Sequence, residues 1–268
     1  MTFLRTIVVR IEQKFNLAIS KIKVSIHLSI LYRHAILEYD QVDSSTEEPN
    51  IICEFFLVIS PDSSHERHFI LYCQKKISEY LKSISADIKI MHEFTDGCSS
   101  QYKSRNCMGD VSRIHGELGY SKIIRNFYET SHEKGPQDAT GGFVKHQADM
   151  AVLMGSEMIQ NAKDFFDFVD NKLRIPQSGI YKRPVFRYAE EIPGDKIPDY
   201  KPVYQNRKIH QISSTGTTEK LQVRPLSCYE CVGCLEGELE NCGNKTLIGK
   251  HQTVEMKIEM IRNINFTL

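Results

Sequence analysis

The chain has 268 residues, of which 41% are hydrophobic and 25% are charged, and its 34 basic side chains balance its 34 acidic ones. This length and composition support one large domain, or one domain with a smaller appendage, and argue against a wholly disordered chain. The absence of net charge excludes a protein that is held to nucleic acid or to a membrane by bulk charge, but it allows a local basic patch.

The apolar segments and the cysteines indicate where such a protein works. No apolar run approaches the roughly 18 residues of a transmembrane helix, so we expect no membrane span. Arg5 and Arg10 interrupt the apolar N-terminal stretch, which lacks a small-residue cleavage site, so we expect no secretory signal. The 8 cysteines are too few for a disulfide scaffold at this length. We therefore expect a nuclear or cytoplasmic protein.

Residues 1–170 predict alternating helices and strands. Apolar side chains recur at helical spacing in some segments, and others are continuous apolar runs of strand length. In chain order the pattern predicts a helix over 2–17, strands at 21–32 and 51–59, a helix over 68–84, a strand at 87–94, a helix over about 99–116, a strand at 121–128 and a helix over about 138–168. This alternation predicts an α/β domain, with a mixed or parallel sheet and helices on its faces.

The remaining residues differ in composition. Six of the nine prolines lie in 171–226, which excludes long helices there, and eleven basic against five acidic side chains leave a local positive excess. We expect 171–226 to be a basic, proline-rich connector, and 227–268 to be a small cysteine-rich module with a tail.

Two carboxylates stand where predicted strands and helices meet. Asp96 follows the strand at 87–94, so we expect it at the carboxyl edge of the sheet, where α/β proteins bind ligands. Asp138 opens the last predicted helix after a glycine-rich turn. Each residue alone is explained by helix capping. Together they can converge on Mg²⁺ or Mn²⁺, hard cations that prefer oxygen ligands and that act on phosphodiesters when paired.

Three segments carry a resemblance to a known family: FTDGCSSQYKSRN, NFYETSHEKGPQDATGGFVK and RPLSCYECVGCL. They resemble the corresponding blocks of transposon-derived, DDE-type nuclease-like proteins of invertebrate genomes, over roughly residues 21–245. The resemblance implies an RNase H-like fold whose carboxylates coordinate Mg²⁺ for cleavage and joining of DNA strands. It also implies that Asp96 and Asp138 are two of these carboxylates.

The sequence departs from this family near its start. Relatives carry a DFSEN-like strand segment, whereas the residues before Lys21 contain Glu12 but no such block, so we expect the first strand and its carboxylate to be missing. Asp40 is a weak replacement, because it lies in a polar connection. We expect a truncated or decayed transposase whose catalysis is impaired, and whose partners are DNA and an oligomer or a longer transposase relative. The alternative is a non-enzymatic DNA- or chromatin-binding protein.

Basic side chains near the two acidic segments are the candidate DNA contacts. Such side chains can hold phosphates in register beside a metal site, but they can equally be solvated residues balanced by acidic neighbours. The candidates are Lys103, Arg105, His132, Lys134 and Lys145.

The cysteine-rich segment carries metal-ligand spacing. Its pattern is C-x2-C-x2-C-x7-C, followed after eight residues by a histidine, and pairs of cysteines at this spacing grip Zn²⁺. Five candidates compete for four tetrahedral positions, and reduced free thiols are the alternative. The candidates are Cys228, Cys231, Cys234, Cys242 and His251. If zinc binds, the sulfurs of its ligands should lie within roughly 3.5–4 Å of one another.

Overall fold

The computed structural model describes residues 6–12, 15–16, 23–45, 47–62, 67–95, 97, 102–128, 136–175, 182–194 and 198–259. The strands are β1 (Thr6–Glu12), β2 (Phe15–Asn16), β3 (Lys23–His34), β4 (Ile51–Ser60), β5 (Ile90–Thr95), β6 (Lys122–Phe127), β7 (Lys182–Tyr188), β8 (Gln211–Ser214), β9 (Lys220–Arg224) and β10 (Gln252–Glu255). The longer helices are α2 (Arg67–Ser83), α3 (Arg105–Leu118), α4 (Pro136–Leu153) and α5 (Ala162–Lys172). Short helical turns are α1 (Leu37–Asp40), η1 (Asn206–Lys208), α6 (Val232–Leu235), η2 (Leu239–Asn241) and α7 (Lys245–Ile248).

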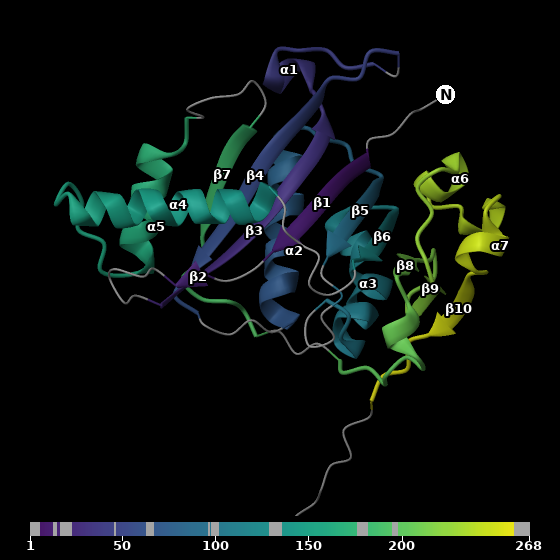
Figure 1. Cartoon of the computed structure of the whole chain (residues 1–268). Coiled ribbons are helices and arrows are strands. Elements are labelled where there is room, and N and C mark those ends of the chain that lie inside the picture. Colours follow the sequence, from purple (N-terminus) through teal and green to yellow (C-terminus); the bar gives the residue numbers. More distant parts are fainter. Residues whose placement is uncertain are drawn as a thin grey trace, which may run out of the picture.

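The strands form one mixed sheet in the order β10-β9-β8-β6-β5-β1-β3-β4-β7, and β2 pairs with β3 beside this path. Strand β1 lies inside the sheet, antiparallel to β3 and parallel to β5 (Figure 1). Strand β3 is antiparallel to β4, and β5 is parallel to β6. The last strands, β8 to β10, extend the sheet beyond β6 through antiparallel pairs.

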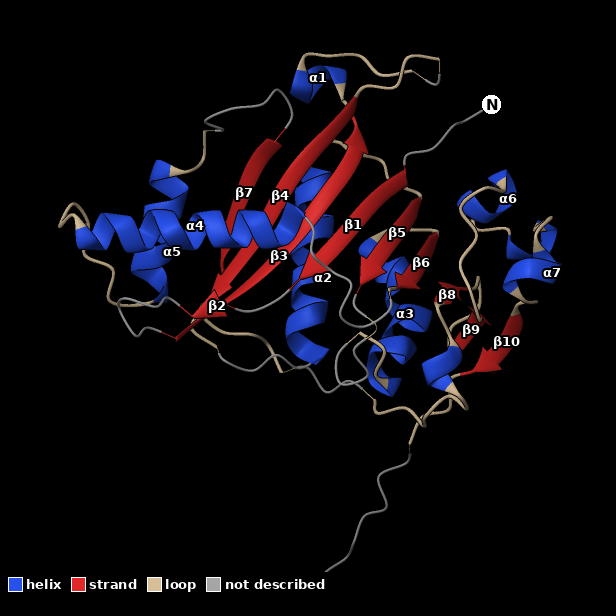
Figure 2. Ribbon diagram, in the orientation of Figure 1, coloured by secondary structure: helices blue, strands red, loops and turns tan. Residues whose placement is uncertain are grey.

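Two layers of side chains cover the sheet. On β4, Phe56 and Val58 pack with α2 and α3, whereas Phe55 and Leu57 pack with α4 and α5. This alternation follows from the geometry of a strand, whose successive side chains point to opposite faces. Strand β4 therefore reads as a continuous apolar run because both of its faces are covered. Figure 2 shows α4 crossing one face and α2 lying behind the other.

Most of the predicted elements are confirmed. The strands predicted at 21–32, 51–59, 87–94 and 121–128 correspond to β3, β4, β5 and β6, and the last three of these share one sheet as expected. The predicted helices over 68–84 and 99–116 correspond to α2 and to α3, the latter capped by Ser104, whose hydroxyl accepts from the Cys107 N–H. The mixed α/β class is therefore correct.

The helix predicted over 2–17 is wrong, because residues 6–12 form β1. Its segment TIVVRIE is rich in β-branched side chains, which lose little freedom in a strand and more in a helix. The apolar spacing that suggested a helix carries less weight than this composition and the two neighbouring strands. The sheet therefore has a strand where the sequence analysis expected the first one to be missing.

The single helix predicted over 138–168 is also wrong, because the structure has α4 and α5 separated by a loop. Gly155 takes a positive φ of 66° just after the first helix ends, a conformation that glycine adopts without strain. Asn161 then caps α5, its side-chain oxygen accepting from the Asp164 N–H.

Residues 171–226 are not a mere connector. They contribute β7, β8 and β9 to the sheet, and β7 pairs with β4 in parallel. Pro184 is tolerated within β7 because this strand lies at the end of the strand order. Tyr200 is fully buried against α3. Within the described ranges, no helix is both long and apolar enough to cross a membrane.

The contact between Tyr200 and α3 gives a stability prediction. A methyl group at Gly109 would overlap the Tyr200 ring, so Gly109→Ala should lower the free energy of unfolding by about 1–3 kcal/mol. On the same helix nothing lies within 4 Å of a Cβ at Gly116. There Gly116→Ala should raise stability by about 0.5–1 kcal/mol, because glycine is the poorer helix former. Chemical denaturation of the full chain measures both, and equal effects would contradict the packing described.

Candidate metal centre

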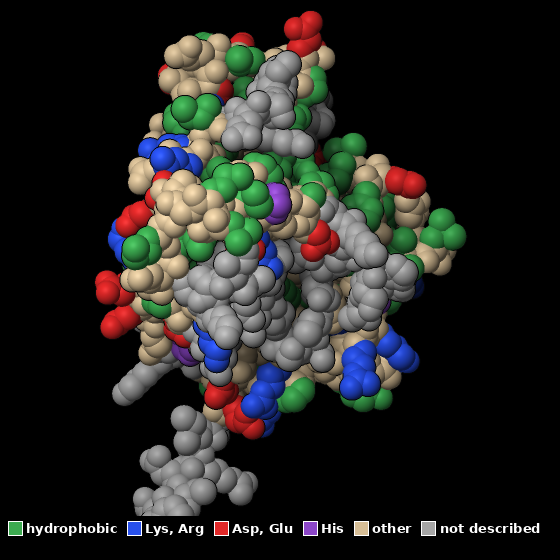
Figure 3. Space-filling view, turned by 60° about the vertical axis from the view of Figure 1, so that its left-hand side comes forward, with side chains coloured by type: hydrophobic (Ala, Val, Ile, Leu, Met, Phe, Trp, Pro, Cys, Tyr) green, Lys and Arg blue, Asp and Glu red, His purple; other side chains and the backbone are tan. Residues whose placement is uncertain are grey.

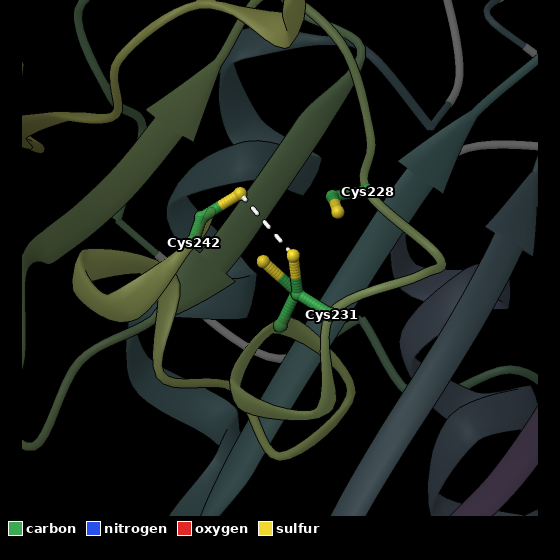
Figure 4. Close-up of side chains that lie close together, drawn as sticks. Cys228, Cys231 and Cys242 are labelled. Carbon is green, nitrogen blue, oxygen red and sulfur yellow. Dashed lines mark hydrogen bonds between the residues drawn. The ribbon is translucent and has the colours of Figure 1, made fainter. Parts of the chain in front are cut away.

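Four cysteines meet where the chain leaves β9. Cys228 lies in the loop after that strand, Cys231 directly precedes α6, Cys234 lies within α6, and Cys242 follows η2. Their four Sγ atoms all lie within 4.8 Å of one another. Figure 4 shows the sulfurs of Cys228, Cys231 and Cys242 turned toward a common centre. The convergence predicted from the spacing is therefore confirmed, although the limit of 4.8 Å is wider than the predicted 3.5–4 Å.

The separation of the sulfurs suits a tetrahedral cation. The Sγ atoms of Cys231 and Cys242 are 4.0 Å apart. Four thiolates bonded to Zn²⁺ at about 2.3 Å lie about 3.8 Å from one another. No disulfide joins the cysteines of the described ranges. The group can therefore hold a metal ion such as Zn²⁺.

Backbone N–H groups already favour a thiolate at one of these positions. Burial, the largest influence, raises the pKa of Cys228, but the backbone N–H groups of Cys231 and Glu230 and the neighbouring thiols lower it to about 6. At Cys234 burial dominates and raises the pKa to about 12. A cation that binds all four sulfurs must therefore displace protons from the others, so its affinity rises with pH.

The residues around the cysteines, 227–251, form a cysteine-rich module with little apolar core of its own. Its buried members are Cys228, Cys234, Cys242 and Leu239, with Ile248 partly buried beside them. So small a group of side chains gives little hydrophobic stabilisation. Contacts to the sheet supply more, and a metal ion held by the cysteines would add folding energy of its own.

The module packs on the sheet through β5 and β6. His92 of β5 donates from Nε2 to the Leu235 carbonyl at 2.8 Å, and Lys122 of β6 donates to the Gly237 carbonyl at 2.5 Å. The Phe94 ring lies 5.7 Å from the Tyr229 ring. The module therefore covers part of these two strands. Burial lowers the pKa of His92, so the ring is neutral at pH 7.

The fifth proposed ligand stays apart. His251 is half-buried, but it is not among the residues whose ligand atoms converge. Its spacing from Cys242 was compatible with a zinc site, but the described structure brings four cysteines together without it.

The predicted carboxylate site is described only in part. Asp138 lies exposed in the first turn of α4. Asp96 lies outside the described residues, as do His132 and Lys134, so the predicted approach of Asp96 to Asp138 stays a prediction. Asp40, considered as a replacement carboxylate, instead pairs with the buried Arg33.

Asp40 belongs to a buried ion network. Its Oδ2 accepts from Arg33 at 2.6 Å, and Arg33 also donates to Glu54 at 2.8 Å. Burial opposes ionisation of Asp40, but the hydrogen bond from Arg33 and the positive charges of Arg33 and Arg183 hold its pKa below the usual range. This pairing could not be predicted from the sequence, because Glu54 stands in an apolar strand.

Two of the candidate DNA contacts, Lys103 and Arg105, have other partners. Lys103 is buried, donates to the Arg207 carbonyl at 2.9 Å and has its pKa lowered by burial, so it is not available to a phosphate. Arg105 pairs with Glu259 at 2.9 Å. Lys145 is half-buried on α4, and burial lowers its pKa. In the view of Figure 3, side chains of both charge signs are interspersed among the coloured residues.

Comparison with known proteins identifies the family but not a function. A family model described as a domain of unknown function (DUF8701) matches residues 21–227, which is more than half of the chain. The chain therefore belongs to this family. The match ends directly before Cys228, so the four clustered cysteines follow the matched residues. No curated protein and no solved structure matches the chain.

The geometry predicts which residues bind zinc. Cys242→Ser should weaken zinc binding by at least about tenfold, since even loss of a residue that only supports a ligand costs that much. His251→Ala should leave the affinity of the full chain unchanged, because this residue lies outside the cluster. Competition with a chromophoric chelator measures both. Equal loss in the two variants would show that His251 is a ligand.

Proposed function

We propose that this chain is a transposase-derived, RNase H-like protein that acts on DNA phosphodiesters with Mg²⁺ or Mn²⁺. The observation that carries the proposal is the strand order β4-β3-β1-β5-β6, in which β3 is antiparallel to β1 and β5 and β6 are parallel to it. Leaving aside the short β2, this is the order 3-2-1-4-5 of RNase H-like sheets. The order agrees with the family resemblance, which rests on the residues of the sequence blocks alone.

Strand β1 supports a first carboxylate at Glu12. In the parallel pairing of β1 with β5, Arg10 is opposite Phe94. Glu12 follows Arg10 by two residues, as Asp96 follows Phe94 by two residues in the sequence. Parallel strands end at the same edge of a sheet, so this register favours a shared site for the two carboxylates. Glu12 is therefore the candidate for the first carboxylate of the metal site.

Helix α4 supports the third carboxylate. It contacts β1 and β3, and its Val144 belongs to the same buried cluster as Leu28 of β3. Leu28 is the residue opposite Glu12 in the pairing of β1 with β3. Asp138 lies in the first turn of this helix, so it is the candidate for the third carboxylate.

The proposed carboxylates share a defined chemical task. Glu12, Asp96 and Asp138 would hold the divalent ions by their oxygens, the ligand type that Mg²⁺ prefers. The bound ions supply charge stabilisation to the attacking and leaving oxygens of the phosphodiester. A DNA substrate would place the protein in the nucleus.

We also infer that the four cysteines bind Zn²⁺ as a structural centre. A site closed by four protein ligands leaves no open position for substrate, which is typical of structural zinc. The centre would fix the module on β5 and β6, the strands that precede Asp96 and α4.

A nicking assay tests the proposed activity. The purified full chain should nick supercoiled plasmid in Mn²⁺ and not in EDTA, because the ions stabilise the developing charge. Glu12→Gln and Asp138→Asn should each slow nicking at least about tenfold, since each removes a metal ligand. The matched control is Glu117→Gln, which removes an exposed carboxylate paired with Arg113 on α3 and should leave the rate unchanged.

The outcomes separate the two function classes. Plasmid binding without Mn²⁺-dependent nicking would overturn the enzymatic proposal and favour a non-enzymatic DNA-binding protein. Nicking that Glu12→Gln leaves intact would reject Glu12 as the first carboxylate. Thermal melting of each variant checks that a loss of activity is not a loss of fold.

A further inference from the structure

Arg224 is a buried charge without a carboxylate partner. It is the last residue of β9, and 1% of its surface is exposed. Its Nη1 donates to the Cys234 Sγ at 3.5 Å, and its Nη2 donates to the Leu239 carbonyl at 3.2 Å. Its Nε has no partner, and within the described ranges no carboxylate forms an ion pair with it.

The other fully buried arginines are paired in the ordinary way. Arg33 contacts Glu54 at 2.8 Å, and Arg125 contacts Glu93 at 2.7 Å. An unpaired buried charge is strongly unfavourable, so proteins pair such groups with the opposite charge. Arg224 instead directs its guanidinium at a sulfur of the cysteine cluster, so the opposite charge belongs there.

The charge of a loaded centre supplies that partner. Zn²⁺ with four thiolates carries a net charge of about −2, whereas a centre with three thiolates and one histidine carries about −1. We propose that Arg224 is the charge-compensating residue of a tetrathiolate zinc centre, which it stabilises from the end of β9. This inference rests on the proposed zinc binding by Cys228, Cys231, Cys234 and Cys242.

Metal binding and Arg224 then depend on each other. In the metal-free chain the guanidinium has the Cys234 sulfur and the Leu239 carbonyl as partners and no carboxylate within the described ranges, so its burial is poorly compensated. With zinc bound, the same contact becomes a charge-assisted hydrogen bond to a thiolate. Arg224 acts through Cys234 and does not itself bind the metal, so it is a positioning residue.

The first test measures the zinc affinity of the full chain by competition with a chromophoric chelator. Arg224→Met keeps much of the length of the side chain but removes its charge, and it should weaken zinc binding at least about tenfold. Arg224→Lys keeps the positive charge but lacks the two-pronged guanidinium, so its zinc affinity should fall less than that of Arg224→Met. The matched control is Gln222→Met, which removes the hydrogen bond that the uncharged Gln222 amide donates to the Glu240 carboxylate of the same module, and it should change affinity by less than about threefold.

The second test separates charge from packing. Cys231→His keeps four ligands but lowers the negative charge of the centre by one, at a residue with no described contact to Arg224. In that background Arg224→Met should cost clearly less affinity than in the wild type, by at least about threefold. Co²⁺ absorption confirms tetrahedral coordination by thiolates in each variant.

Each failure has a distinct meaning. A wild-type chain that binds neither Zn²⁺ nor Co²⁺ would overturn the proposed zinc centre. Zinc bound equally well by wild type and Arg224→Met would overturn the role of Arg224 and leave the centre standing. Equal losses in the wild-type and Cys231→His backgrounds would show that Arg224 acts by packing, which also overturns the inference.

Discussion

Both faces of the central strands carry apolar side chains, and the rest of the molecule keeps both faces from water. On β4, Phe56 belongs to the layer covered by α2 and α3, and Leu57 to the layer covered by α4 and α5. Ile30 of β3 also belongs to the layer covered by α4 and α5. Across the sheet, Arg10 of β1 is opposite both Ile30 and Phe94 of β5, so Phe94 lies in register with that layer. Helices α4 and α5 contact β1, β3, β4 and β7. The same face of β5 and β6 therefore needs another cover, and the cysteine-rich module provides it.

This difference between the covering elements explains what a metal ion held by the four cysteines would add to the module. A helix brings an apolar stripe and satisfied backbone groups, whereas the segment from 227 to 251 has only short helical turns. Its carbonyls at Leu235 and Gly237 are satisfied by His92 and Lys122 of the sheet. A centre that ties four points of this loop together holds those carbonyls in place. Under the proposed zinc binding, the metal centre and the coverage of β5 and β6 would thus stabilise each other.

The sequence predicted the elements whose local preference and tertiary environment agree. The run IICEFFLVIS could be recognised as a central strand because burial on both faces leaves no alternation to misread. For β1 the spacing of apolar residues suggested a helix, and only the pairing with β3 and β5 selects the strand. The strands between 182 and 224 were not predicted, because the prolines of this segment indicated a connector. Prolines exclude helices there but not edge strands such as β7.

The roles of site residues could be predicted where their partners are near in sequence, and not where the partners are distant. The cysteine cluster could be predicted because its ligands lie within fifteen residues, so their spacing alone encodes the geometry. The charged residues could not, because their roles depend on distant partners: Lys103 on the carbonyl of Arg207, and Asp40 on Arg183 as well as Arg33. Arg224 combines both cases. Its strand gives no hint of a function, yet the sulfur that it contacts follows only ten residues later. Only the structure shows that its charge is buried, and this burial is why the contact with Cys234 indicates a role at the cysteine cluster.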